Sequence, residues 1–390
     1  MSIQLNRREL LKKGALLTGG FAVLNNMFLN KASASPAIQK AVTKVPFYGS
    51  DRAAFETTPP QLKARLLANE NPFGPSPKAK KAIQDAISLS YQYPIESIDL
   101  LEEKIAAYEG LQKGQILLGA GSSPLLLAAA LYFGKGTIVS ATPTYEDLLS
   151  HAEQFGTKVI RVPLTAEHHF DLDAMDKVID KSTSLVYICN PNNPTATVTD
   201  PAKLKAFCER VSKITTVFVD EAYIDYMEDP KAVSLIENIK KGQNIIVART
   251  FSKLYGFAGL RVGYMVAQPE LIKKFSPYAS GPMCLSATSL QAAIAAYEDK
   301  EFLQGAFDNT MLSKKFLYET LKSEGYEYIP SSANFVMFPV KMESRRFAEE
   351  MMKRGVGVRS WKFGGKEWCR VSIGLMEEMK AFATAFKELS

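Results

Sequence analysis

Histidine and cysteine are scarce in this chain, which has 3 histidines and 4 cysteines among 390 residues. The cysteines stand far apart and form no C-x-x-C pair, so the sequence offers no zinc site. We expect buried free thiols, as at Cys189 at the end of an apolar stretch, with a disulfide as the alternative. His168 and His169 lie in the polar stretch TAEHHFDLD, which is typical of a surface turn. These residues assemble neither a metal cluster nor a histidine-based catalytic triad.

A strong charge of one sign, a low-complexity tract and a fixed-period repeat are also missing. The formal net charge of +6 is mild and lies partly near the N-terminus, so it gives no stripe that would bind nucleic acid. Hydrophobic residues make up 46% of the chain, which is ordinary for a globular protein with a substantial core. The length favours two domains.

The N-terminal segment has no apolar run long enough for a membrane-spanning helix. Arg7 and Arg8 precede a weakly apolar run that contains glycines, and Ala32-Ser33-Ala34 follows as a small-x-small cleavage pattern. The NRRELLK core looks like a bacterial twin-arginine export signal. We therefore expect a signal peptide over residues 1–34, recognised by the twin-arginine export machinery, on a periplasmic or otherwise exported protein. An ordinary amphipathic helix on a cytoplasmic protein is the alternative.

Short apolar strands alternate with helices through the middle of the chain. Strands are expected in QILLGAGSSPLLL, GTIVSATPTYEDLLSHAEQFG, KVIRVPL, SLVYICNPNNPTATV, TTVFVDEAYIDY and NIIVARTFSK. Continuous apolar strands between helices indicate a buried, mostly parallel sheet, and therefore an α/β architecture.

A different pattern begins near residue 270. The stretch from SLQAAIAAYEDK to LKSEG is helical, and ANFVMFPV, GVGVRS and WCRVSIG read as strands of a smaller sheet. We predict an N-terminal arm over 35–75 that packs on the small domain, a large domain over 76–275 and a small α+β domain over 276–390.

Polar residues follow the predicted strands, where ligands bind in open α/β sheets. Each feature has an ordinary alternative: a tight turn for Gly121-Ser122-Ser123, a surface charge or helix cap for Asp220, a plain turn for NPNNPT, and a solvated hairpin for the Lys253 region. The ligand interpretation takes the GSS turn and the following helix N-terminus as a phosphate site. It also takes Asp220, behind the apolar run TTVFV, as a buried carboxylate that needs a cationic partner.

Together these features resemble the fold-type I pyridoxal-phosphate enzymes, specifically the class I/II aminotransferases and within them the histidinol-phosphate aminotransferase group. The motifs NENPFGPSP, the YP pair at 93–94, CNPNNPT, VDEAYIDY, RTFSKLYGFAGLRVGY and ANFVMF carry the resemblance, which covers about residues 60 to 390. It implies a mostly parallel central sheet flanked by helices, a smaller α+β domain, pyridoxal 5'-phosphate as the cofactor and a homodimer.

The resemblance also implies a role for each matching residue. Lys253 would hold the cofactor as a Schiff base and move the substrate α-proton. Asp220 would pair with the ring nitrogen, so that the ring acts as an electron sink. The remaining cofactor contacts would come from the phosphate turn (Gly121, Ser122, Ser123), the phosphate clamp (Thr250, Ser252, Arg261), the ring neighbours (Tyr145, Asn193, Tyr223), and Tyr93 across the subunit interface. Arg370 would bind the substrate α-carboxylate, with Asn71 and Asn193 lining the same pocket.

The expected activity is amino transfer between an amino acid, or an amino-alcohol phosphate, and a 2-oxo acid. Three departures from the group's pattern concern the substrate: Ser123-Pro124 replaces an acidic pair, Ala196 a glycine and Ala120 an asparagine. The alternatives are a decarboxylase, racemase or lyase of the same fold, similar to threonine-phosphate decarboxylases, and a non-catalytic periplasmic binding protein. The sequence leaves the amino donor and acceptor open.

Overall fold

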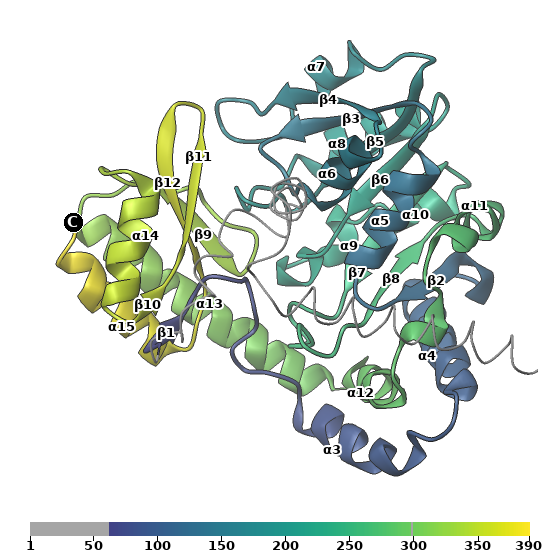
Figure 1. Ribbon diagram of the computed structural model, residues 1–390, viewed down its shortest axis with the longest axis horizontal. Helices are drawn as coiled ribbons and strands as arrows, with labels where there is room; N and C mark the ends of the chain where they lie inside the picture. Colours follow the sequence, from purple (N-terminus) through teal and green to yellow (C-terminus); the bar gives the residue numbers. More distant parts are fainter. Residues whose placement is uncertain (1–61, 298) are drawn as a thin grey trace, which may run out of the picture. The chain divides into compact units, whose positions relative to one another are not determined.

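The computed structural model describes residues 62–297 and 299–390, so the predicted signal peptide and most of the predicted arm lie outside the described residues. A seven-stranded sheet, in the order β2-β8-β7-β6-β5-β3-β4, forms the larger part (Figure 1). Its strands are β2 (Ile116–Gly119), β3 (Thr137–Thr142), β4 (Lys158–Pro163), β5 (Thr183–Cys189), β6 (Thr216–Asp220), β7 (Ile245–Thr250) and β8 (Gly263–Val266).

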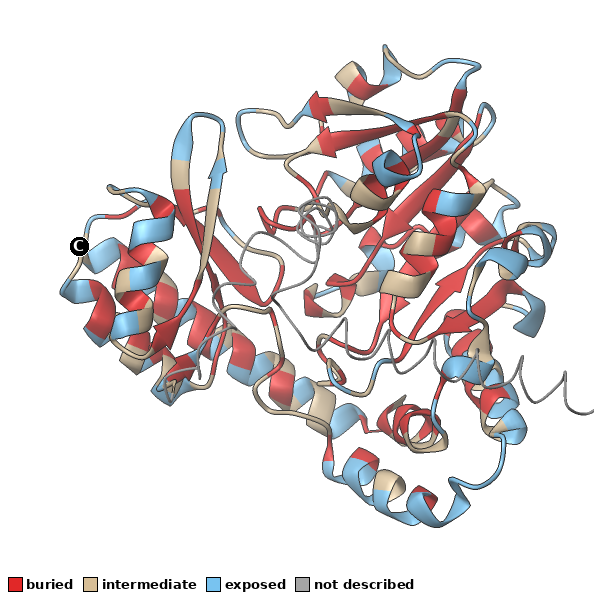
Figure 2. Ribbon diagram, viewed as in Figure 1, coloured by how far each residue is buried: buried red, intermediate tan, exposed pale blue. Residues whose placement is uncertain are grey.

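The large sheet is mostly parallel, as predicted. Strands β4, β3, β5, β6 and β7 pair in parallel, whereas β8 runs antiparallel between β7 and β2. Figure 2 shows the central strands buried along their length. Alternate residues of β5 enter separate cores: Val186 and Ile188 in one, Leu185 and Tyr187 in the other. Because side chains alternate across a strand, both faces of this sheet are covered.

Helices follow the strands of the large sheet. They are α5 (Ser123–Tyr132), α6 (Asp147–Gln154), α7 (Leu172–Asp176), α8 (Pro201–Val211), α9 (Pro230–Val233), α10 (Ile236–Lys240) and α11 (Pro269–Phe275). Short 3-10 turns are η2 (Ile87–Leu89), η3 (Lys113–Gln115), η4 (Ile224–Tyr226), η5 (Ser276–Tyr278) and η6 (Pro282–Cys284). Helix α8 shows why they begin where they do: the Asp200 side chain accepts a 2.9 Å hydrogen bond from the Lys203 amide, and Pro201 occupies the first turn.

The smaller domain contains an antiparallel sheet in the order β11-β12-β9, formed by β9 (Phe335–Pro339), β11 (Arg359–Phe363) and β12 (Lys366–Ser372). Helices α14 (Ser344–Lys353) and α15 (Met376–Lys387) belong to the same domain, which confirms its predicted α+β character. The short strand β1 (Ala64–Arg65) pairs in parallel with β10 (Val356–Gly357). The start of the described chain therefore packs on the C-terminal domain.

Four more helices complete the fold: α3 (Pro77–Ala86), α4 (Ile95–Glu109), α12 (Ala287–Tyr297) and α13 (Lys300–Ser323). Helices α3 and α4 pack on α12. The boundary predicted at residue 276 lies upstream of α12, whose buried Leu290 and Ala293 join the core of the large sheet. Helix α13 then contributes Leu317 and Leu321 to the small-domain core. None of the helices in the described ranges combines the length and apolar character needed to cross a bilayer.

Candidate active site

The carboxyl ends of β5, β6 and β7 lie side by side, because these strands are parallel neighbours. Asn193 lies just after β5, Asp220 ends β6, and Lys253 follows the end of β7. The sequence prediction that these residues meet at one sheet edge is therefore correct, and it is a direct consequence of the parallel topology.

Asp220 is a buried carboxylate, with only 1% of its surface exposed. Its Oδ1 accepts a hydrogen bond from the Ala222 amide at 3.1 Å, and its Oδ2 accepts one from the Tyr187 hydroxyl at 3.3 Å. Burial raises the pKa of Asp220 to about 6. Among the described residues no cation forms an ion pair with it, so the carboxylate suits a ligand that brings a protonated nitrogen.

The Lys253 side chain reaches across to the N-terminal loop. Its Nζ donates to the backbone oxygen of Asn69 at 3.2 Å and lies 5.2 Å from the centre of the Tyr223 ring. Burial and the positive charge of Arg370 lower the pKa of Lys253 to about 8. A lysine in this state supplies a neutral amine near physiological pH, which a nucleophile requires.

The Tyr223 hydroxyl accepts two amide hydrogen bonds, from Asn69 Nδ2 at 3.0 Å and from Asn193 Nδ2 at 3.4 Å. Asn69 is a residue that the sequence analysis missed. It is 2% exposed, has a φ of +52°, and its Oδ1 accepts a hydrogen bond from the Ser372 hydroxyl. Asn71 Nδ2 donates to the Leu254 oxygen at 2.6 Å and its Oδ1 accepts from the Phe73 amide at 3.0 Å, and the pocket role predicted for Asn71 stays a prediction.

Arg370 lies on β12 and is only 5% exposed. Its Nη1 donates to Asn193 Oδ1 at 2.7 Å, and its guanidinium carbon lies 5.3 Å from the centre of the Phe335 ring. Within the described part of the chain its Nε has no hydrogen-bond partner. Burial lowers the pKa of Arg370 to about 10. The side chain is thus a buried cation with a donor available for a carboxylate or phosphate.

The glycine turn after β2 forms a backbone cradle at the start of α5. Gly121 has a φ of +84°, and a Cβ placed there would lie 2.3 Å from Arg261 Nη2. A Cβ at Gly263 would lie 2.7 Å from the carbonyl carbon of Gly121. The two glycines therefore allow the turn, β8 and the Arg261 side chain to approach closely. Ser122 precedes α5, and Ser123 is its first residue, so Pro124 occupies the second position.

The predicted phosphate clamp is assembled at this turn. Arg261 Nη1 donates to Ser252 Oγ at 3.2 Å, and the Thr250 hydroxyl donates to the same oxygen at 2.9 Å. Arg261 itself has a φ of +56°, an unusual backbone conformation for a residue with a Cβ. Hydroxyls, a guanidinium and a helix N-terminus here provide the donors that a phosphate needs.

The two aromatic residues predicted to contact the cofactor, Tyr145 and Tyr93, differ in burial. Tyr145 follows β3, is half-buried and packs against the core of the large sheet. Tyr93, by contrast, is 80% exposed and precedes α4. The predicted contact of Tyr93 with a partner subunit's cofactor stays a prediction.

A buried ion network, which the sequence analysis missed, lies beneath the site. Arg249 on β7 contacts Glu109 of α4 and, at 3.0 Å, Glu221 beside Asp220. Its Nη2 also donates to the Ser234 hydroxyl at 2.9 Å. This network ties α4 to the ends of the two strands that carry Asp220 and Thr250.

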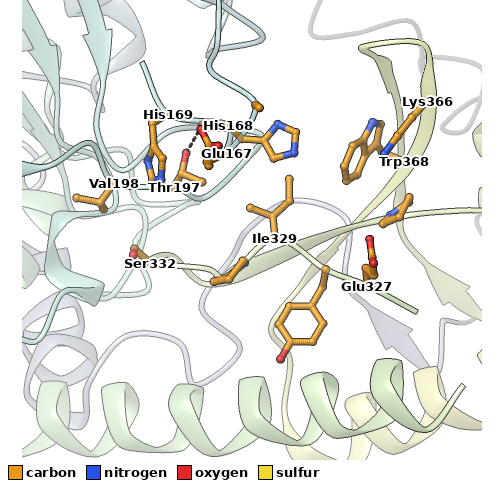
Figure 3. A pocket seen from close by; sticks show the side chains of 14 residues that line it. Glu167, His168, His169, Thr197, Val198, Glu327, Ile329, Ser332, Lys366 and Trp368 are labelled. Carbon is orange, nitrogen blue, oxygen red and sulfur yellow. Dashed lines mark hydrogen bonds between the residues drawn. The ribbon is translucent and has the colours of Figure 1, made fainter. Parts of the chain in front are cut away.

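A cavity of about 590 Å³ lies between the two domains (Figure 3). His168 and His169 line it from one side and Trp368 from the other. The histidines lie in a turn, as predicted, since the His168 amide donates to the Thr165 oxygen at 2.9 Å and both residues are partly exposed, and this turn borders the cavity. The His168 and Trp368 rings meet edge to face at 5.4 Å. The cavity lining contains none of the predicted cofactor-binding residues. In the described ranges, no three histidine, cysteine or acidic residues are grouped to hold a metal ion.

The residues at the sheet edge fit pyridoxal 5'-phosphate. Asp220 matches the ring nitrogen, Tyr223 and Asn193 match the phenolic oxygen, and the clamp at the glycine turn matches the phosphate. The cofactor's ring nitrogen would supply the counter-charge that the buried Asp220 carboxylate lacks. A substrate anion would accept a hydrogen bond from the unpartnered Nε of Arg370.

Comparison with known proteins agrees with this fit. Residues 63–386 match the family model described as aminotransferase class I and II. A histidinol-phosphate aminotransferase 2 of Carboxydothermus hydrogenoformans is 38% identical over 333 residues, covering 83% of this chain and 90% of that protein. One from Moorella thermoacetica is 36% identical over 329 residues, covering 83% and 85%. The crystal structure of the Sinorhizobium meliloti histidinol-phosphate aminotransferase with pyridoxal-5'-phosphate superposes with a TM-score of 0.82 at 26% identity, covering 92% of this chain and 98% of that one.

Proposed function

The chain belongs to the class I and II aminotransferase family and is a pyridoxal-phosphate-dependent aminotransferase, and from this premise we propose the roles of its residues and its substrates. The cofactor supplies an electron sink for the substrate α-carbon. Lys253 would hold the cofactor through Nζ and would move the substrate α-proton. Asp220 holds the proton on the ring nitrogen. Tyr223 and Asn193 orient the ring, and the clamp of Thr250, Ser252 and Arg261 holds the phosphate.

One observation carries this assignment: a lysine of lowered pKa shares its pocket with a buried arginine that pairs with no carboxylate of the described chain. Arg370 raises the fraction of neutral Lys253, and its Nε has no hydrogen-bond partner among the described residues. A substrate with a carboxylate next to its amino group would satisfy Arg370 and bring its α-carbon toward Lys253.

We propose that the acceptor is a 2-oxo acid bound through Arg370, and that the donor is an amino acid or an amino-alcohol phosphate. The relatives named above support the second option, since histidinol phosphate is an amino-alcohol phosphate. Such a donor has no carboxylate, so its phosphate would have to occupy the same guanidinium.

A panel of donors tests the proposal. Purified holoenzyme is mixed with single amino acids and with histidinol phosphate, and the loss of the visible absorption of the bound cofactor is followed together with formation of the oxo product, which is a 2-oxo acid from an amino acid and an oxo-alcohol phosphate from histidinol phosphate. Amino transfer predicts both signals, and Lys253→Ala should show neither. Carbon dioxide release without oxo-acid formation would instead identify a decarboxylase.

We also propose that the protein is exported to the periplasm. The twin arginine at residues 7–8 and the Ala32-Ser33-Ala34 pattern support export to the periplasm. Replacing both arginines with lysine in a bacterial host should retain the protein in the cytoplasm. Equal fractions of wild-type and variant protein in the periplasm would contradict this route.

A homodimer is supported by a run of exposed apolar side chains that ends at α4 and includes Tyr93. These side chains are Ile87, Leu89, Tyr91, Tyr93 and Ile95, exposed by 47–81% of their surface. Large exposed apolar patches mark interaction surfaces. Analytical ultracentrifugation of the holoenzyme should give twice the chain mass, and a fully active monomer would contradict the proposal.

A further inference from the structure

Lys314 lies on α13 and is buried, with 7% of its surface exposed. Its Nζ donates to two backbone oxygens, that of Ser331 at 2.9 Å and that of Ala333 at 3.2 Å. Among the described residues no carboxylate forms an ion pair with it. Two carbonyl dipoles are therefore its polar partners.

An ammonium group in this environment is unfavourable for folding. Burial alone lowers the pKa of Lys314 to about 8, with no compensating carboxylate. Well-packed apolar side chains commonly replace such buried charges without loss of stability. A cation at a position where it lowers stability points to a functional reason.

The loop that Lys314 holds, residues 331–334, contacts the active site from the small-domain side. The Ser332 amide donates to the Ala196 oxygen at 2.8 Å, and Asn334 Nδ2 donates to the Glu70 oxygen at 3.2 Å. Ala333 is fully buried in a cluster with Ala196 and Tyr223. The loop thus touches the segments that carry Asn193, Asn69 and the ring-binding tyrosine.

Phe335 follows this loop and transmits its position to the substrate-binding arginine. Its ring meets the Tyr223 ring edge to face at 5.1 Å, and the Arg370 guanidinium lies over its face at 5.3 Å. Ser331 also stabilises the loop from within, because its Oγ accepts a hydrogen bond from the Ala333 amide at 3.1 Å. A shift of the loop would therefore displace Phe335 and, with it, Arg370.

We propose that Lys314 is a positioning residue that fixes the 331–334 loop, and so sets the place of Arg370 for the carboxylate of the substrate. The inference rests on the proposed role of Arg370. Lys253, Asp220 and the phosphate clamp belong to the large sheet, so loss of Lys314 leaves the covalent, ring-nitrogen and phosphate contacts of the cofactor in place, although the loop also touches Tyr223. Its effect falls on substrate binding.

The test compares Lys314→Met with Lys315→Met, its exposed neighbour on the same helix. In Lys314→Met holoenzyme, KM for the amino donor and for the 2-oxo acid should rise about tenfold, with kcat changed by less than about threefold. The ratio of bound cofactor to protein should match wild type. Lys315→Met should behave as wild type throughout. A merely structural role would lower cofactor content, kcat and melting temperature together, and that result would overturn the proposal.

Ser331→Ala provides a second route to the same loop. It should raise KM about threefold, and the double variant should be no worse than Lys314→Met alone, because both changes release one loop. A folded Lys314→Met with wild-type KM overturns the proposal. If Lys314→Met does not fold, a wild-type KM in Ser331→Ala overturns the proposal instead.

A binding measurement separates this inference from the proposed function. Calorimetric titration of holoenzyme with the dicarboxylate glutarate requires no turnover. Binding should weaken about tenfold in Lys314→Met even if the wild type transaminates none of the donors tried. Equal affinities in wild type and variant overturn the role of Lys314 whatever the activity.

Discussion

Arg370 and Asn193 are joined by a 2.7 Å hydrogen bond from the guanidinium Nη1 to the amide Oδ1. Arg370 belongs to β12 of the small sheet, whereas Asn193 lies just after β5 of the large sheet. The bond therefore links the proposed substrate-carboxylate site to the proposed cofactor site. Since Asn193 also donates to the Tyr223 hydroxyl, a substrate that engages Arg370 can influence the groups around the cofactor ring.

Arg370→Lys should raise KM for the 2-oxo acid by about 10- to 100-fold. The lysine keeps the charge but loses the planar pair of N–H groups that binds a carboxylate in two places. Steady-state kinetics at saturating donor measures the change. Arg359→Lys, at the cross-strand neighbour, serves as the control and should alter KM by less than about twofold. A larger effect at Arg359 than at Arg370 would reverse the assignment.

Attachment of the cofactor to Lys253 should accelerate as pH rises, with a midpoint near pH 8 and a plateau above it. Burial and Arg370 lower the pKa of Lys253 to about 8, and the reactive neutral amine predominates above that value. Stopped-flow absorption after mixing cofactor with the cofactor-free chain, between pH 6 and 10, measures the profile. A midpoint above pH 10 would show an unperturbed lysine and contradict the geometry. Lys253→Ala should give no covalent absorption band at any pH.

Asp220→Asn should stabilise the cofactor-free chain at neutral pH while impairing catalysis. The folded-state pKa of Asp220 is raised to about 6, so its protonated form is favoured in the folded chain. The stability that the protonated Asp220 contributes to the wild-type chain is fully present below pH 3.8 and is lost as pH rises through 6. At pH 7.5 the variant should be more stable by about 2–3 kcal/mol. Urea unfolding of both cofactor-free chains at pH 4 and 7.5 measures the difference, and an equal difference at both pH values would contradict the cause.

The active-site residues on parallel strand ends were predictable because strand direction alone brings them together. Lys253, Asp220 and Asn193 each follow an apolar strand, and parallel pairing places those ends at one edge. Local sequence could not choose between Asn69 and Asn71 in NENP. The choice depends on a backbone φ of +52° at Asn69 and on the Ser372 hydroxyl, which lies 303 residues away along the chain.

The supporting residues Arg249 and Lys314 could not be predicted from local sequence either, because their roles depend on tertiary contacts. Arg249 stands inside the apolar strand IIVART, and its partner Glu109 lies 140 residues away on α4. Lys314 looks like its neighbour Lys315, and only the folded chain shows that one is buried and the other exposed. Burial of a charged residue is decided by tertiary packing, which helical periodicity indicates only when a whole face is apolar.

Arg249→Leu should destabilise the protein by about 3–5 kcal/mol. The change leaves Glu109 and Glu221 buried without their shared counter-charge. Burial already raises the pKa of Glu109, so the loss should be smaller at acid pH, where the Glu109 carboxyl is protonated. Chemical denaturation measures the free energy of unfolding. Lys81→Ala, which breaks an exposed pair with Asp85, should change that free energy by less than about 0.5 kcal/mol. Equal losses in the two variants would mean that the buried network contributes no more than a surface pair.

Tyr93→Phe should weaken retention of the cofactor without dissociating the dimer. The change removes only the hydroxyl that is proposed to reach the phosphate in the partner subunit, and it leaves the aromatic ring in place. Loss of one hydrogen bond to a charged group corresponds to about 1.5–3 kcal/mol, or about 10- to 150-fold in the dissociation constant. Tyr91→Phe is the matched control, since Tyr91 is 81% exposed, lies two residues away and has no proposed cofactor contact. Dialysis followed by absorption measures retention, and ultracentrifugation measures mass. Equal retention in the two variants would show that the Tyr93 hydroxyl does not reach the cofactor, whereas a monomeric Tyr93→Phe would assign the hydroxyl to the interface itself.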